Sequence, residues 1–416
     1  MDKTNRPRAG RSRIILALFL LSAIVAVGLR AGEAEAFAVG HTSVTYQDPA
    51  RGNRSIPTEI YYPALTAGEN VPVAEGLFPV VTFGHGFLLP YDIYSFVWNG
   101  LVPDGFIVAL PRTEGSLTPS HGEFGKDLAF LVAKLRAEGA NSGSLFYERV
   151  SDAAAVMGHS MGGGASFLAA AEDPTITALA NFAAAETNPS AIAAAGSITV
   201  PSLLLAGSRD CVTPPSQHQI PMYDALASGC KTYVNITGAS HCQFAAYNFT
   251  CSLGETGCPS PTITRAVQHG ITIEYLSLWL DFHLKGNASS WIQFQDLLAS
   301  DGRVTFLQEC AITSVARGES GVPLSSRIDL AARPNPFNPS TTIVVSLPEK
   351  AAARLLVYDA RGRAVRTLLA REIPAGITTI EWDGTDDGGA PLPSGAYFSR
   401  IETRDGARTV KLILVR

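Results

Sequence analysis

The sequence lacks any excess of positive charge. Its 416 residues carry 32 Lys and Arg against 37 Asp and Glu, a net charge of −5, and no basic stripe runs through the body of the chain. Proteins that bind nucleic acid need clustered cationic side chains for the phosphate backbone, so this class of function is not expected. With 46% hydrophobic and only 17% charged residues, the composition predicts globular domains with substantial cores. The length predicts two of them.

Long hydrophobic runs are absent beyond residue 29. The run at residues 14–29 follows five basic side chains and precedes an A-x-A sequence at 34–36. It is shorter than the roughly 20 residues that span a bilayer, which disfavours the alternative of a membrane anchor. A basic segment, an apolar run and an A-x-A sequence, in this order, are typical of a cleaved signal peptide. We therefore expect residues 1–36 to be removed, the mature chain to have no transmembrane segment, and the protein to be secreted or attached to the cell surface.

Cysteine is absent before residue 211, and all six cysteines fall between residues 211 and 310. An even number in an exported chain predicts disulfides, but fifteen pairings are possible and the sequence selects none of them. The spacings match no zinc pattern and no histidine pair accompanies them, so a metal site is not expected.

The most informative motif that is present is G-H-S-M-G at residues 158–162, with Ser160 at its centre. Residues 153–157 are an apolar run suited to a buried strand, and residues 163–171 are small and apolar residues suited to a helix. Hydrolases expose a nucleophilic serine in a sharp turn between a strand and a helix, where flanking glycines leave room for the neighbouring backbone. Ser160 is therefore the candidate nucleophile, and the alternative is an ordinary glycine-rich loop. His159 is expected to pack in the core.

A serine nucleophile needs a base and an acid, and candidates for both follow predicted strands. Residues 200–207 are an apolar run with Asp210 in the loop after it, and residues 232–236 are a β-rich run that precedes His241. In this interpretation His241 removes the proton of the serine and Asp210 orients the imidazole.

An oxyanion hole is expected after the predicted strand at residues 79–83, in the sequence G-H-G-F at 84–87. The backbone N–H groups of Phe87 and Met161 are the candidate donors to the charge that develops on the carbonyl oxygen. The alternative is an ordinary turn from strand to loop.

Competing residues lack this setting at the end of a strand. Asp224 is the nearest alternative carboxylate, but residues 221–226 have the pattern of a helix. Five other histidines are expected to have surface or structural roles: His41, His121, His218, His269 and His283.

Two cysteines lie beside the candidate acid and base. Cys211 follows Asp210 directly, and Cys242 follows His241 directly. A bridge between these two cysteines could tie the acid to the base, and Cys251 and Cys258 could close a short loop.

Alternating strand-like and helix-like segments in residues 37–312 predict an α/β fold, a doubly wound and mainly parallel sheet with helices on both faces. Apolar residues recur at helical spacing over residues 124–135 and 271–284. The second of these helices is expected to be the last one of the domain.

The composition changes after residue 310. Residues 313–330 are expected to form a linker, and short β-rich runs alternate with turn signals in residues 331–416. The chain is thus expected to divide into a signal peptide (1–36), a catalytic domain (37–312), a linker and a small C-terminal domain. An all-β, immunoglobulin-like sandwich is predicted from five candidate strands, at residues 341–347, 354–358, 377–382, 396–402 and 408–415.

The motifs at residues 84–89, 158–164 and 238–241 resemble those of the α/β-hydrolase superfamily, in particular the branch with chlorophyllases, cutinase-like polyester hydrolases and dienelactone-hydrolase relatives. The resemblance covers the whole predicted catalytic domain. Dienelactone hydrolases use a cysteine nucleophile, whereas this chain has Ser160 there. Polyester-active relatives carry a Trp after the strand that follows the nucleophile, and residues 183–188 contain none, so the resemblance implies no aromatic clamp.

The C-terminal domain has its own resemblance. The sequences at residues 334–341, 357–363, 382–384 and 394–398 resemble the bacterial secretion-sorting domain of type IX export, also described as a flagellar-hook-cap-like immunoglobulin module. The resemblance implies a bacterial secretion or sorting machinery as partner and says nothing of catalysis.

These features together predict an exported serine hydrolase, of the esterase, lipase or cutinase-like kind, that cleaves carboxylic esters through an acyl-enzyme. No cofactor is expected, because hydrolysis by a serine nucleophile needs none. Its substrate is expected to be a small-molecule or polymeric ester. Two alternatives stay open: an amide or peptide hydrolase with the same triad, and a catalytically inactive surface-binding protein on the same fold.

Overall fold

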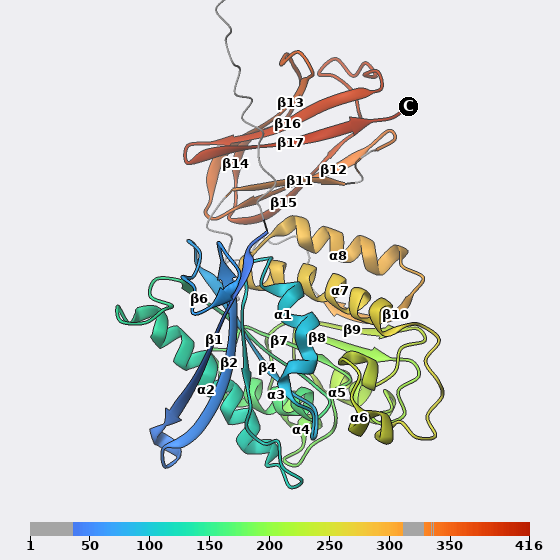
Figure 1. Cartoon of the computed structure of the whole chain (residues 1–416). Helices are drawn as coiled ribbons and strands as arrows, with labels where there is room; N and C mark the ends of the chain where they lie inside the picture. The colour runs from blue at the N-terminus through green and yellow to red at the C-terminus, as the bar shows by residue number, and fades with distance from the viewer. Residues whose placement is uncertain (1–35, 311–327, 334, 336) are drawn as a thin grey trace, which may run out of the picture. The chain divides into compact units, whose positions relative to one another are not determined.

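The computed structural model describes residues 36–310, 328–333, 335 and 337–416 (Figure 1). The predicted signal peptide and most of the predicted linker lie outside these residues. Within the described ranges, no helix is both long enough and apolar enough to cross a bilayer.

Residues 36–310 contain a ten-stranded sheet in the order β10-β9-β8-β7-β6-β4-β5-β2-β1-β3. Its six inner strands, from β5 to β9 in this order, pair in parallel, whereas β2 pairs antiparallel with β5 and β10 pairs antiparallel with β9. The strands are β1 (Ala38–Asp48), β2 (Arg54–Ala64), β3 (Gly68–Glu69), β4 (Phe78–Gly84), β5 (Ile107–Pro111), β6 (Val150–His159), β7 (Ala178–Phe182), β8 (Ser202–Gly207), β9 (Cys230–Ile236) and β10 (Val304–Cys310).

Helices cover both faces of this sheet, because successive residues of a strand point to opposite sides. Val80 and Leu204 pack into one core with α2 and α3, while their neighbours Val81 and Leu205 pack into another with α1, α7 and α8. The mainly parallel, doubly wound sheet predicted from the sequence is confirmed. The helices are α1 (Ser95–Leu101), α2 (His121–Ala140), α3 (Met161–Glu172), α4 (Ala191–Ala195), α5 (Gln219–Ala225), α6 (Phe249–Gly254), α7 (Arg265–Lys285) and α8 (Ala288–Ser300).

The prediction that residues 271–284 form the last helix of this domain is wrong. They lie within α7, which ends where Gly286 adopts a left-handed conformation with φ 69°. Asn287 then caps α8, its side chain accepting a hydrogen bond from the backbone N–H of Ser289. Phe294, on α8, is fully buried in the same core as α7.

The C-terminal residues form a small all-β unit, as predicted. A three-stranded sheet has the order β11-β12-β15, and a four-stranded sheet has the order β14-β13-β16-β17. The sequence did not predict β11 or β14. In β14 only two residues are buried and its register with β13 shifts, so the alternating pattern that marks a strand is missing. The strands are β11 (Asp329–Arg333), β12 (Thr341–Leu347), β13 (Ala351–Asp359), β14 (Ala364–Ile373), β15 (Gly376–Trp382), β16 (Gly395–Thr403) and β17 (Gly406–Leu414).

One buried histidine makes the stability of the fold depend on pH. His283, on α7, packs against the rings of Trp279, Phe282 and Trp291, and neither ring nitrogen has a hydrogen-bond partner among the described residues. Burial lowers the pKa of His283 from 6.5 to about 3. The unfolded chain therefore binds a proton below pH 6.5 that the folded protein does not, and stability falls as the pH falls.

We expect His283→Leu to remove the part of this dependence that comes from His283. At pH 5 the buried imidazole costs the wild-type protein about 2 kcal/mol relative to pH 7, at about 1.4 kcal/mol per pH unit below 6.5. Urea unfolding at both pH values measures this cost as the difference between wild type and variant. Equal losses of unfolding free energy in the two proteins would show that His283 titrates normally.

Candidate active site

Ser160 occupies a strained turn between β6 and α3. Its φ of 54° and ψ of −118° are rare for a residue with a side chain. The residues two before and two after it, Gly158 and Gly162, have no room for a side chain. A Cβ on Gly158 would lie 2.3 Å from the carbonyl carbon of Gly162, and one on Gly162 would lie 2.1 Å from the carbonyl oxygen of Gly84. The strand, turn and helix expected around Ser160 are present.

Asp210 lies in the loop after β8 and is 6% exposed. Its Oδ1 accepts hydrogen bonds from the backbone N–H groups of Val212 at 2.9 Å and Thr213 at 2.8 Å. Its Oδ2 lies 2.8 Å from Nδ1 of His241. The two backbone donors hold the carboxylate so that one oxygen faces the imidazole.

His241 lies in the loop after β9 and is 2% exposed. Because Nδ1 faces a carboxylate, it carries the proton, and Nε2 is left with the lone pair that a general base needs. Gln268, on α7, holds this loop through two hydrogen bonds to the backbone of Ser240: its Oε1 accepts at 3.1 Å and its Nε2 donates at 2.9 Å. Gln268 lies within an otherwise ordinary helical pattern, so its sequence context does not indicate this contact.

The turn that carries Ser160 lies beside His241. The rings of His159 and His241 are 4.7 Å apart between centroids. His159 is fully buried, as expected, and desolvation holds its pKa well below the usual range. The neutral ring therefore adds no charge next to His241.

Tyr94 links this turn to the loop after β4. Its hydroxyl accepts a hydrogen bond from the backbone N–H of Gly86 at 2.9 Å and lies 2.9 Å from Nδ1 of His159. Since His159 is neutral, its Nδ1 can accept the single hydroxyl proton of Tyr94. Burial raises the pKa of Tyr94 far above its usual value, so that proton is retained. Tyr94 stands in a short 3-10 helix and had no signal in the sequence.

The two candidate oxyanion donors lie at the ends of these segments. Phe87 is in the turn after β4, and its backbone N–H has no acceptor among the described residues. Met161 is the first residue of α3, where the first backbone N–H groups of a helix have no partner within the helix. Gly84 and Gly162 are in close contact, which brings the two segments together.

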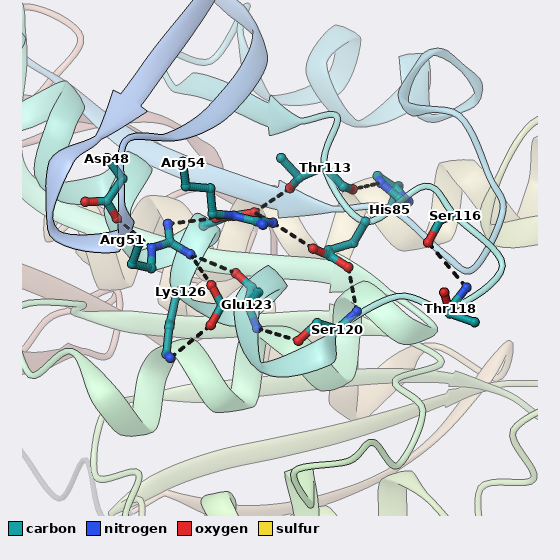
Figure 2. Close-up of polar contacts among 12 residues, drawn as sticks. Asp48, Arg51, Arg54, His85, Thr113, Ser116, Thr118, Ser120, Glu123 and Lys126 are labelled. Atoms are coloured by element: carbon teal, nitrogen blue, oxygen red, sulfur yellow. Dashed lines mark hydrogen bonds and ion pairs between the residues drawn. The ribbon is translucent and has the colours of Figure 1, made fainter.

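A network of polar and charged side chains, joined to the G-H-G-F loop through His85, lies next to this loop (Figure 2). His85 reaches the carbonyl oxygen of Thr113 through Nε2 at 2.8 Å, and the hydroxyl of Thr113 donates to Asp127 at 2.6 Å. Asp127 is fully buried and pairs with both Arg54, at 2.9 and 2.7 Å, and Arg51, at 2.7 Å. Asp127 lies on α2, whereas its three partners lie at the start of β2 and in the segments after β1 and β5, so no local pattern in the sequence indicates that they meet.

Disulfides are present, but both suggested pairings are wrong. Cys211 pairs with Cys258, and Cys242 pairs with Cys251. The reason is that Cys251 in α6 and Cys258 just after it lie against the loops that carry Asp210 and His241. Each of these two loops is thus joined to the segment 251–258 rather than to the other loop. The third disulfide joins β9 to β10 at directly opposed positions, Cys230 and Cys310.

The first two disulfides should support activity as well as stability. Replacing Cys211 and Cys258 together by Ser, or Cys242 and Cys251 together, should lower the unfolding free energy by about 4 and 3 kcal/mol, for separations of 47 and 9 residues. We also expect kcat to fall, because the loops that hold Asp210 and His241 are released.

The matched control is the double serine variant of Cys230 and Cys310, at a separation of 80 residues. It should lose about as much stability with little change in kcat. Thermal unfolding and ester hydrolysis of the three variants, measured well below their melting temperatures, check this. A similar drop of kcat in all three would show that the effect is global.

Two family models match parts of the chain. The family model described as PET hydrolase-like matches residues 33–257, and the model described as the FlgD Ig-like domain matches residues 335–407. The second match confirms the resemblance of the C-terminal unit to a flagellar-hook-cap-like module.

Similar proteins include several named cutinases. Cutinase 1 of Thermobifida cellulosilytica is 35% identical over 88 residues, which are 21% of this chain and 32% of the relative. A cutinase of Thermobifida fusca (strain YX) is also 35% identical over 88 residues, 28% of its own length. The bis(hydroxyethyl) terephthalate hydrolase of Streptomyces coelicolor is 26% identical over 183 residues, which are 44% of this chain and 54% of the relative.

The chain therefore spans between about a quarter and about half of the length of these relatives. The family model reaches further, since it covers more than half of the chain and includes the turn at Ser160, the Asp210 loop and His241. The chain belongs to the PET hydrolase-like family of α/β-hydrolases.

Proposed function

We propose that the protein is an exported serine hydrolase that cleaves carboxylic esters through an acyl-enzyme. The observation that carries this proposal is the buried pair of His241 and Asp210, 2.8 Å apart, beside the strained turn that presents Ser160. Family membership supports the proposal, and so do the printed names of the relatives, cutinase and bis(hydroxyethyl) terephthalate hydrolase.

The proposed reaction begins when Oγ of Ser160 attacks the ester carbonyl while Nε2 of His241 takes its proton. The tetrahedral oxyanion accepts hydrogen bonds from the backbone N–H groups of Phe87 and Met161. His241 then protonates the leaving alcohol as the carbon–oxygen bond breaks, which leaves the acyl group on Ser160. Water attacks this acyl-enzyme by the same steps, His241 again taking and returning a proton, and the carboxylic acid is released.

The substrate class is proposed from the relatives and from the wall of the site. Residues 183–188, which follow β7, contain no aromatic side chain. We therefore propose an ester without dependence on an aromatic clamp at that wall, of either small-molecule or polymeric kind.

The test is hydrolysis of p-nitrophenyl esters of graded acyl length by the purified mature chain, with p-nitroanilides as the amide counterpart. We expect ester turnover with an initial burst of nitrophenol, the mark of an accumulating acyl-enzyme. Cleavage of the anilides at comparable rates would instead support the amide hydrolase. No turnover of any compound by a folded protein would support the inactive binding protein.

We further propose that residues 1–36 are a cleaved signal peptide, 37–312 the catalytic domain, 313–330 a linker and 331–416 a sorting domain read by a bacterial secretion machinery. The match of residues 335–407 to the FlgD Ig-like domain supports the last of these. All residues assigned to the reaction lie before residue 310.

Deletion of residues 331–416 should therefore leave catalysis intact and disturb delivery. We expect kcat/KM of the purified truncated protein to stay within about threefold of the full chain, because a separate domain adds no group to the site. In the native host the truncated enzyme should remain in the periplasm while the full chain reaches the surface or the medium, as fractionation with an esterase assay would show. A truncated protein that folds but has lost its activity would mean that the C-terminal domain shapes the active site.

A further inference from the structure

Thr213 lies where the acid meets the base. Its Oγ1 is 2.9 Å from Oδ2 of Asp210 and 3.1 Å from Nδ1 of His241, and the residue is 3% exposed. The hydroxyl therefore stands beside the hydrogen bond that joins the two catalytic side chains. Nothing in the sequence marked this threonine, which follows the acid by three residues in a loop.

The same hydroxyl reaches the backbone that supports the nucleophile. Oγ1 of Thr213 lies 3.1 Å from the carbonyl oxygen of Ala183. The carbonyl of the preceding residue, Phe182, accepts a hydrogen bond from the N–H of Ser160 at 3.0 Å, and the N–H of Ala185 donates to the carbonyl of Ser160 at 2.9 Å. Ala183 itself has a φ of 44°, a conformation that persists only where surrounding contacts hold it.

Gln219, on α5, orients the hydroxyl. Its Nε2 donates to Oγ1 of Thr213 at 3.2 Å and to the carbonyl oxygen of Ala184 at 2.6 Å, and the side chain is fully buried. A hydroxyl has one proton and two lone pairs. With Gln219 on one lone pair, the proton can go to Asp210 or Ala183, and the second lone pair is left to face the N–H of His241.

We propose that Thr213 is a positioning residue for the reaction: its hydroxyl holds the pair of His241 and Asp210 in register with the turn that carries Ser160. This inference rests on the proposed esterase function. Thr213 does not touch the substrate in this scheme. It acts by limiting rotation of the imidazole and by fixing the distance between the acid–base pair and the strand end at Ala183.

Thr213→Val keeps the shape of the side chain and removes the hydroxyl. We expect kcat to fall by about 10- to 100-fold, with KM within about threefold, because the hydroxyl acts on groups that move the proton and not on substrate binding. Thr213→Ser, which restores the hydroxyl, should recover most of the lost kcat.

The matched control is Thr58→Val, on β2. Thr58 is also buried, and among the described residues its hydroxyl donates only to the carbonyl oxygen of Ile56, at 3.1 Å. This variant should keep both kcat and KM. If Thr213→Val does not fold, Gln219→Leu removes the orienting donor instead and should lower kcat by about 3- to 10-fold. A Thr213→Val enzyme with kcat within twofold of wild type, or a Thr213→Ser enzyme as slow as Thr213→Val, would overturn the proposal.

A readout that needs no turnover separates this inference from the proposed function. The Nδ1–H proton of His241 should give a downfield proton NMR signal, assigned by its loss in His241→Ala. In Thr213→Val we expect this signal to shift and to exchange faster with solvent, whereas Thr58→Val should leave it in place. An unchanged signal in Thr213→Val would contradict the positioning role even if Ser160 proved to be the nucleophile, and a changed signal would support it even if the substrate were not an ester.

Discussion

Ser160→Ala and His241→Ala should each abolish nearly all ester hydrolysis that depends on the triad. We expect kcat to fall by about 10⁵- to 10⁶-fold in either variant, because without the hydroxyl there is no nucleophile and without the imidazole no group takes its proton. The double variant should be little slower than either single one, since the two residues act as a unit. Steady-state hydrolysis of a p-nitrophenyl ester, with protein concentrations high enough to measure the residual rate, gives all three values.

Ser166→Ala is the matched control for the serine. Ser166 is fully buried on the same helix, α3, and its hydroxyl donates to the carbonyl oxygen of Gly163, at 2.6 Å, and to no other group in the described part of the chain. Its replacement should keep kcat within about threefold, at a stability cost of about 1 kcal/mol. Near wild-type turnover by a pure Ser160→Ala protein would eliminate the proposed mechanism, whatever the control does.

Asp210→Asn should lower kcat by about 10⁴-fold while the protein stays folded. The amide of the new side chain would donate to Nδ1 of His241 and place the imidazole proton on Nε2, where it blocks uptake of the serine proton. The amide oxygen of the new side chain would take the place of Oδ1 and accept the same hydrogen bonds from the backbone N–H groups of Val212 and Thr213, so the loop keeps its structure.

Asp224→Asn tests the alternative carboxylate. Asp224 is exposed on α5, so its replacement should leave kcat unchanged. A large loss in Asp224→Asn together with a small one in Asp210→Asn would reverse the assignment of the acid.

That Asp210 and His241 lie near one another, at the edge of the sheet where Ser160 also lies, could be predicted for a simple reason. In a parallel sheet the carboxyl ends of all strands meet at one edge, so residues that follow successive strands come together without any knowledge of the side chains between them. The apolar runs at 153–157, 200–207 and 232–236 fall in β6, β8 and β9, and the structure places Asp210 beside His241.

The supporting side chains could not be predicted in this way. Tyr94, Thr213 and Gln268 contact the site through hydrogen bonds between segments far apart in the chain, and a lone polar residue in a loop or helix gives no local sign of its partner. The pairing of the cysteines could not be predicted for the same reason. The neighbours of Cys211 and Cys242 suggested that these two would pair, but they pair instead with Cys258 and Cys251, which lie just after and within α6.

Secondary structure was missed where the local pattern was weak. Helix α8 begins only two residues after Gly286 ends α7. A glycine that signals the end of one helix gives no indication that another helix starts directly after it. Strand β14 is mostly exposed and irregular in register, and it lacks the alternation that identified its neighbours. Both elements depend on packing with the rest of their unit rather than on their own sequence.

The claim that Ser160 forms an acyl-enzyme can be tested by trapping that species. Rapid acid quench of the mature protein with a slowly deacylating p-nitrophenyl ester, followed by digestion and mass spectrometry, locates any added acyl group. We expect stoichiometric acylation of the peptide that contains residues 158–162, confined to Ser160 and absent in Ser160→Ala. Turnover without acylation of Ser160, or an acyl group on another residue that persists in Ser160→Ala, would contradict the proposed chemistry.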